Sequence, residues 1–267
     1  MVAVYHLFDV FFLDSEQITH SFKARGAFNN IIKLVESGQE ARLKKKGLTT
    51  TSSGNAGIGY ALACHTFGIP LQVHVPDQIT ELKERMMVKY SAEVIKHKLD
   101  YMDIITMAET SARVRGTELI DSCNYIDVLG GNGTVGLEIL NDLPDVDVIF
   151  LPVGGGSLIS STAVYVKTVN PKIQIIGCQP ETNSAMEHLV RTGKYDKLLL
   201  QDTISDATEG DVYENSVIET ASALPIAAFL SVAEDYRDKK VALVITGSNI
   251  GCEKIKYILQ NYSQHTF

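Results

Sequence analysis

Short runs of β-branched and apolar residues alternate with longer segments whose apolar residues recur every three or four positions. The short runs predict strands at Leu48–Thr51, Leu71–Val75, Glu93–Lys96, Tyr125–Val128, Val148–Pro152, Ile173–Gly177 and Val241–Thr246. The amphipathic segments predict helices near residues 24–36, 55–67, 80–90, 101–117, 135–142, 158–168, 183–192, 216–235 and 251–261. Such alternation is typical of βαβ units, so the sequence predicts an α/β fold with mostly parallel sheets and helices on both faces.

Composition narrows the class of protein. A chain of 267 residues that is 45% hydrophobic can build one large or two modest domains. Its formal net charge of −8 makes nucleic acid and anionic membranes poor partners. No signal peptide and no membrane-length apolar run is seen, and the four cysteines form no close pair that predicts zinc or a disulfide framework. A cytoplasmic protein is therefore expected.

The first candidate for chemistry is Lys23, in the stretch THSFKARGA at residues 19–27. Lys23 precedes an amphipathic run and so stands at a predicted helix N-terminus, where the helix dipole disfavours a cation. The same field, with partial burial, favours the neutral amine that forms Schiff bases. A solvated surface lysine is the alternative, because one lysine is a weak motif.

A second candidate is the turn after the strand Leu48–Thr51, where residues 49–57 read TTTSSGNAG. Backbone N–H groups and hydroxyls at a helix N-terminus make an anion site, and ligands of open α/β sheets bind at the carboxyl ends of strands. An ordinary turn with Ser53 or Asn55 as N-cap fits equally well.

Glycines mark two further turns. Residues 152–160 read PVGGGSLIS, and three glycines before an apolar helix favour a phosphate cradle over a simple turn. Residues 131–136 read GNGTVG, which satisfies the dinucleotide fingerprint, but the glycine run stands where the matching acidic residue is expected. The stretch ITGSN at 245–249 again places hydroxyls at the end of a strand.

Taken together and in this order, SFKARGA, SSGNAG, GGGS and TGSN resemble the motifs of fold type II pyridoxal-phosphate enzymes, with threonine/serine dehydratases (ammonia-lyases) and serine racemase as the closest groups. Further similarities are SAEVI at 91–95, NGTVGLEIL at 132–140 and TISDA at 203–207. The resemblance implies a two-domain fold similar to the β subunit of tryptophan synthase. It extends from about Asp14 to Asn249.

The resemblance assigns a role to each matching position. It implies that Lys23 holds the cofactor and removes the α-proton, while Phe22 and Asn55 contact the cofactor ring. The substrate-carboxylate loop matches Ser52, Ser53, Gly54 and Asn55, and Ser53 also matches the second acid/base of serine racemase. The phosphate cradle matches Gly154, Gly155, Gly156, Ser157 and Leu158. Thr246 matches the hydroxyl that faces the pyridine nitrogen, and Asp206 is a candidate ligand for a divalent cation.

Several positions depart from the family pattern. His20, Ser157, Ser248 and Ala207 each stand where the family usually has glycine. The family segment before the lysine, and a block between Thr208 and Ala221, have no counterpart here; Glu219 matches an acidic residue that follows that block. The resemblance therefore implies cofactor binding more directly than it implies activity.

The function implied is β-elimination of water from L-threonine or L-serine, giving a 2-oxo acid and ammonia. The alternatives are serine racemisation, β-replacement, and a truncated, non-catalytic homologue that binds the cofactor. A dinucleotide oxidoreductase is a remote further possibility. The expected division places a smaller domain at 46–126 within a larger cofactor-binding domain of 1–45 and 127–267. A homo-oligomer that acts on a small amino acid is expected.

Overall fold

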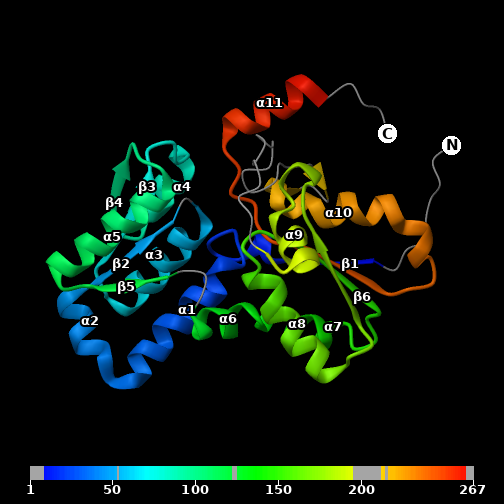
Figure 1. Cartoon of the computed structure of the whole chain (residues 1–267), viewed down its shortest axis with the longest axis horizontal. Helices are drawn as coiled ribbons and strands as arrows, with labels where there is room; N and C mark the ends of the chain where they lie inside the picture. Colours follow the sequence, from blue (N-terminus) through cyan, green and yellow to red (C-terminus); the bar gives the residue numbers. More distant parts are fainter. Residues whose placement is uncertain (1–8, 53, 122–124, 195–211, 214–215, 263–267) are drawn as a thin grey trace. The chain divides into compact units, whose positions relative to one another are not determined.

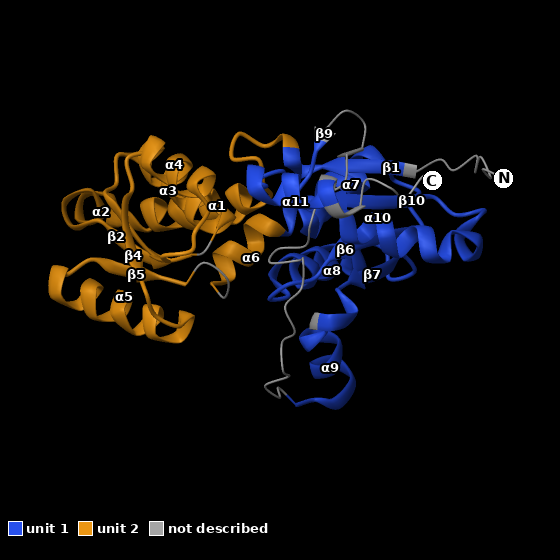
Figure 2. Ribbon diagram, turned by 90° about the horizontal axis from the view of Figure 1, so that it is seen from above, with its two compact units in different colours: residues 1–15, 133–267 blue, residues 16–132 orange. Residues whose placement is uncertain are grey.

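The computed structural model describes residues 9–52, 54–121, 125–194, 212–213 and 216–262. They form two compact units, which Figure 2 colours separately: unit 1 draws on residues 1–15 and 133–267, and unit 2 on residues 16–132. These units group residues by contact. The domain division expected from the sequence, with 46–126 as the smaller domain, stays a prediction.

Unit 2 is built on a parallel sheet with the strand order β4-β3-β2-β5. Its strands are β2 (Leu48–Thr51), β3 (Leu71–Pro76), β4 (Glu93–His97) and β5 (Glu118–Ile120). Its helices are α1 (Lys23–Leu34), α2 (Glu40–Lys46), α3 (Asn55–Phe67), α4 (Glu81–Lys89), α5 (Tyr101–Arg115) and α6 (Ile126–Asn132). A π-helical turn, Val35–Gln39, joins α1 to α2.

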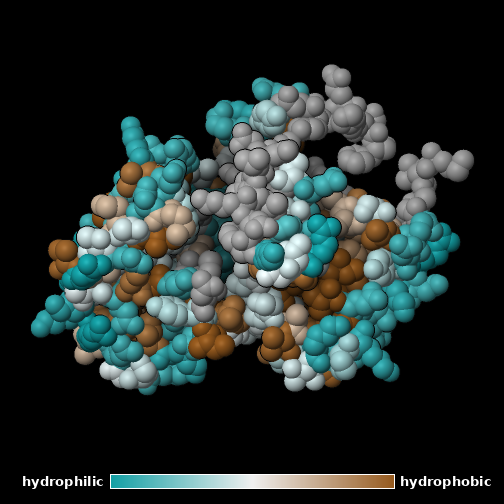
Figure 3. Space-filling model, in the orientation of Figure 1, coloured by the Kyte–Doolittle hydropathy of each residue, from teal (hydrophilic) through white to brown (hydrophobic). Residues whose placement is uncertain are grey.

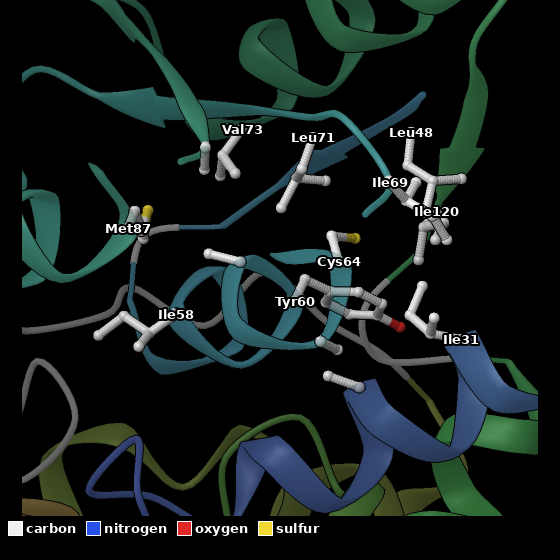
Figure 4. Packing of buried hydrophobic residues seen from close by; sticks show 14 of the residues in the cluster. Ile31, Leu48, Ile58, Tyr60, Cys64, Ile69, Leu71, Val73, Met87 and Ile120 are labelled. Atoms are coloured by element: carbon white, nitrogen blue, oxygen red, sulfur yellow. The ribbon is translucent and has the colours of Figure 1, made fainter. Parts of the chain in front are cut away.

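Helix α3 lies at the centre of unit 2. It is apolar nearly all round, as a helix buried on several sides must be. Figure 4 shows this helix between the sheet and α1, with Cys64 facing the side chains of the sheet and Tyr60 lying near Ile31 of α1. The buried hydroxyl of Tyr60 donates to Oδ1 of Asn30 at 3.0 Å, which ties α3 to α1. The position of α1, and hence of Lys23, is therefore fixed by this core.

Unit 1 contains a second parallel sheet, ordered β1-β10-β6-β7. Its strands are β1 (Asp9–Leu13), β6 (Val148–Pro152), β7 (Gln174–Cys178) and β10 (Val241–Ile245); β8 (Val212–Tyr213) and β9 (Ser216–Val217) form a separate antiparallel pair. Its helices are α7 (Thr134–Asp142), α8 (Ser157–Val169), α9 (Ala185–Thr192), α10 (Thr220–Val232) and α11 (Cys252–Tyr262). Short 3₁₀ turns lie at Asp14–Glu16, Glu181–Asn183 and Ala233–Tyr236.

The central strands of unit 1 are covered on both faces, as the unbroken apolar runs of β6 and β10 predict. Helix α10 packs on one face, where Phe229 meets the ring of Phe150 edge-on with centroids 5.6 Å apart. Helices α7 and α8 lie on the other side of the sheet (Figure 1). Because the strands are parallel, the ends of β6 and β10 lie at the same edge of the sheet.

The predicted alternation of strands and helices is confirmed, with one segment assigned the wrong structure and four short strands not predicted. Residues 125–128 were predicted to be a strand because of their β-branched and aromatic residues, but residues 126–132 form α6. The cause is a tertiary contact. Asp127 O accepts a 2.6 Å hydrogen bond from Asn29 Nδ2 of α1, and Gly131 lets the two backbones approach so closely that a Cβ there would collide with Arg25 O. The strands not predicted are β1, β5, β8 and β9; of these, β1 pairs with β10 so that Leu13 lies beside Ile245.

The surface carries both polar and apolar side chains. In the face shown in Figure 3, hydrophilic residues alternate with smaller apolar groups. Among the residues that the structure describes, no helix has the length and hydrophobicity needed to span a bilayer.

Candidate functional site

Lys23 is the first residue of α1, as the amphipathic pattern predicts. No acidic residue occupies the first turn, so the helix dipole acts on this end of α1 without a compensating carboxylate from that turn. The Lys23 ammonium lies over the ring of Phe22, 4.8 Å from its centroid. Ser21 is fully buried, and its hydroxyl accepts a 3.4 Å hydrogen bond from Lys23 N. Ser21 and Phe22 thus position both the backbone at the start of α1 and the side chain of Lys23.

His20, two residues before Phe22, has a left-handed backbone with φ of 55°. Its N–H donates to Gln17 O at 2.6 Å, which closes a tight turn before α1. The family's glycine at this position would adopt that conformation without a Cβ penalty. The turn is therefore retained although the residue differs.

The turn between β2 and α3 is organised by Ser52, which is buried. Its hydroxyl oxygen accepts from Gly57 N at 2.8 Å and from Gly54 N at 3.2 Å. Ser52 therefore satisfies N–H groups at the start of α3, where Gly54 is the N-cap and Asn55 is the first helical residue. Asn55 is half-buried at this helix N-terminus.

Unit 2 brings this turn close to the start of α1. A Cβ at Gly59, one turn into α3, would lie 3.0 Å from the carbonyl oxygen of Lys23, so only glycine allows the two backbones to pack this closely. Sequence reasoning did not identify Gly59 or Lys83. Lys83 of α4 places Nζ 3.3 Å from the position of a Cβ on Gly54, which adds a cation beside a helix N-terminus.

In unit 1, the glycine run follows β6 and leads into α8. Gly156 is the N-cap of α8 in a left-handed conformation, with φ of 83°, and its carbonyl accepts from Ser160 N at 2.9 Å. Gly154 and Gly155 are exposed, and a Cβ on either would meet no atom within 4 Å. They are thus not required by packing within the described chain. Ser157 and Leu158, the first residues of α8, are buried.

Thr246 follows β10 at the same edge of the sheet, beside the strand that carries the glycine run. It is 1% exposed, and its hydroxyl lies 3.2 Å from that of Ser222 on α10. Unit 1 therefore brings the glycine run and Thr246 to one edge, whereas Lys23 and the Ser52–Asn55 turn share unit 2.

Two predicted site residues, Ser53 and Asp206, lie outside the described residues. Across the part of the chain that is described, no group of three or more His, Cys, Asp or Glu side chains is placed to hold a metal. The divalent cation and the role of Ser53 remain predictions. The GNGTVG stretch runs from the end of α6 into α7 and does not follow a strand, so the context that a dinucleotide fingerprint requires is missing.

Comparisons with known proteins agree with these motifs. The family model described as pyridoxal-phosphate dependent enzyme matches residues 7–215. An L-threonine ammonia-lyase of Thermotoga maritima is 32% identical over 280 aligned positions, covering 92% of this chain and 68% of the relative. Threonine deaminase isoform 2 from Solanum lycopersicum shares the fold, with a TM-score of 0.84 at 24% identity over 95% of this chain and 83% of that one. Serine racemase from Dictyostelium discoideum has a TM-score of 0.79 at 28% identity, over 91% of this chain and 87% of its own.

Proposed function

Since the chain belongs to the pyridoxal-phosphate dependent enzyme family, and pyridoxal phosphate is therefore its cofactor, we propose that it removes water from L-threonine or L-serine. The products are a 2-oxo acid and ammonia. When bound, the cofactor supplies an electron sink for charge that develops at the substrate α-carbon. The protein supplies binding, orientation and proton transfer.

The observation that carries the proposal is the pairing of Thr246 with the glycine run at one edge of the unit 1 sheet. The open space at Gly154 and Gly155, before the N-terminus of the 13-residue helix α8, suits a phosphate. Beside it, Thr246 offers a hydroxyl that is neutral at every relevant pH, which suits an uncharged ring nitrogen. An uncharged ring is the weaker electron sink, and this favours prompt loss of the β-hydroxyl over transamination.

The motifs of unit 2 match the remaining roles that the proposal requires. Lys23 would hold the cofactor through its amine, and the same amine, once displaced by substrate, would take the α-proton. Ser52, Gly54 and Asn55, with N–H groups at the start of α3, would bind the substrate carboxylate. The ring of Phe22 beside the Lys23 side chain supports a ring-packing role for Phe22.

The test is product analysis on cofactor-loaded protein with L-threonine and L-serine. We expect 2-oxo acid and ammonia in equal amounts, and none from Lys23→Ala. Borohydride reduction followed by peptide mapping should place the pyridoxyl group on Lys23. A label on another lysine would contradict the role of Lys23.

Serine racemisation is the second candidate, supported by the likeness to serine racemase. Chiral chromatography of the same reactions separates the two functions. If D-serine forms faster than 2-oxo acid, the main function is racemisation and not elimination. If neither product forms, the protein is a cofactor-binding protein without either activity.

A further inference from the structure

A buried serine, Ser222, lies directly behind Thr246. Ser222 is on the first turn of α10 and is fully buried, and its Oγ lies 3.2 Å from Oγ1 of Thr246. Its oxygen also accepts from Gly247 N at 2.8 Å and lies 2.8 Å from Gly247 O. No motif in the sequence singled out Ser222, because it becomes a neighbour of Thr246 only when α10 packs on β10.

The protons of this cluster can be counted. A serine hydroxyl has one proton and two lone pairs. Gly247 N–H uses one lone pair, so the proton of Ser222 can go to Gly247 O or to Thr246 Oγ1. Gly247 O also accepts from Glu219 N at 2.9 Å, so it keeps a partner when Ser222 turns away. The Ser222 proton can therefore move between two acceptors without leaving a buried group unsatisfied.

The two positions of the proton have different consequences for Thr246. When Ser222 donates to Gly247 O, its second lone pair takes the Thr246 proton, and Thr246 can then only accept from a ligand. When Ser222 donates to Thr246 Oγ1, the Thr246 proton is released to point toward a ligand. Thr246 and Ser222 are both neutral, so neither compensates a positive charge on a buried ring nitrogen.

We propose, on the basis of the function proposed above, that Ser222 is a positioning residue for the cofactor ring. On cofactor binding it turns its proton from Gly247 O to Thr246 Oγ1, so that Thr246 donates to an unprotonated ring nitrogen. The chain of donors Ser222–Thr246–nitrogen strengthens each hydrogen bond in it. Ser222 also holds the Thr246 side chain in the rotamer that this contact needs.

A double-mutant cycle tests the coupling. Wild type, Ser222→Ala, Thr246→Val and the double variant are compared by the Kd for pyridoxal phosphate and by the pH dependence of the bound cofactor's absorbance. Losing one hydrogen bond in the chain should raise Kd about threefold to tenfold for each single variant. Since Ser222 acts through Thr246, the double variant should bind no more weakly than Thr246→Val alone. In both single variants, the pH midpoint of the bound cofactor's absorbance change should differ from that of the wild type.

Two controls separate positioning from stability. Ser231→Ala makes the same change on α10 at an exposed hydroxyl that donates to Ala228 O, and should leave Kd and spectrum unchanged. Should Ser222→Ala not fold, because Gly247 N loses its partner, Ser222→Cys keeps a similar side chain with a weaker donor and should give a smaller change of the same sign.

The outcomes distinguish this proposal from the function. The proposal for Ser222 fails if the fold-changes in Kd of the two single variants multiply in the double variant and the absorbance titration does not shift. Ser222 would then only support the backbone, even if the wild type is an active enzyme. A wild type that binds the cofactor but forms neither 2-oxo acid nor D-serine would overturn the function, while a coupled cycle would still support Ser222. A wild type that binds no pyridoxal phosphate would overturn both.

Discussion

The imidazoles of His74 and His97 lie edge to edge in unit 2: Nδ1 of His74 is 2.9 Å from Nε2 of His97, and the ring planes differ by 11°. Gln72 fixes the tautomers of this pair. Its Nε2 donates to Glu93 at 3.0 Å, so its Oε1 faces Nε2 of His74 at 2.9 Å. His74 must donate from Nε2 and accept at Nδ1 from His97. A second proton on His74 would meet the N–H of His97.

This arrangement predicts that acid destabilises the protein through His74. Burial and then the neighbouring His97 lower the pKa of His74 from 6.5 to about 4. The unfolded chain binds a proton at His74 below pH 6.5, whereas the folded chain does not until about pH 4, so the free energy of unfolding falls as the pH drops through this window. By pH 5 the loss should be about 2 kcal/mol.

Urea denaturation at pH 7.5 and pH 5 measures this loss. His74→Gln should remove most of the difference between the two pH values, because glutamine does not titrate. His65→Gln is the matched control, since His65 is exposed on α3, and it should retain the wild-type difference. Equal pH dependence in wild type and His74→Gln would show that another group is responsible.

Gly155 should be essential for cofactor affinity and dispensable for folding. Gly155→Asp would put a negative charge into the open space before α8, and we expect the Kd for pyridoxal phosphate to rise more than tenfold, or about 1.4 kcal/mol. The melting temperature without cofactor should hardly change, because the added side chain meets no packed atoms and the backbone of Gly155 is not left-handed.

Thr168→Asp is the control for charge. It adds the same carboxylate at an exposed position in the last turn of α8, far along the helix from the glycine run, and should leave the Kd nearly unchanged. A wild-type Kd in folded Gly155→Asp would mean that the glycine run does not bind the phosphate.

Ser91→Gly should stabilise unit 2. Helix α4 ends in a Schellman motif, in which Ala92 N donates to Met87 O at 3.2 Å and Ser91 N donates to Val88 O at 2.9 Å. The motif needs a left-handed residue at Ser91, whose φ is 62°. Glycine adopts this conformation without the Cβ penalty, so thermal denaturation should show a gain of about 1 kcal/mol. Ser91→Ala keeps the penalty and should give no such gain.

Sequence reasoning reached the local features of this protein better than its tertiary ones. The start of α1 at Lys23, the strand before Ser52 and the apolar strand before Thr246 follow from periodicity within each segment. Periodicity did not predict the helix at residues 126–132, because this helix depends on close contact between Gly131 and α1. Periodicity also could not identify Ser222, because its partner, Thr246, is 24 positions away along the chain.

Thr246→Asp should change which products the enzyme makes. Thr246 is 1% exposed, and its hydroxyl lies 3.2 Å from that of Ser222, so an aspartate there would be buried; in the proposed site it would face the cofactor ring. A carboxylate would favour the protonated ring nitrogen, because an adjacent opposite charge stabilises the charged form. The protonated ring is the stronger electron sink, so transamination products should rise as a fraction of turnover while 2-oxo acid formation from elimination falls. Mass spectrometry of products from L-threonine and L-serine measures this partitioning. Thr246→Asn, whose side chain has the shape of aspartate without its charge, should keep a product ratio close to that of the wild type. Wild-type partitioning in a cofactor-loaded Thr246→Asp variant would mean that Thr246 does not face the ring nitrogen.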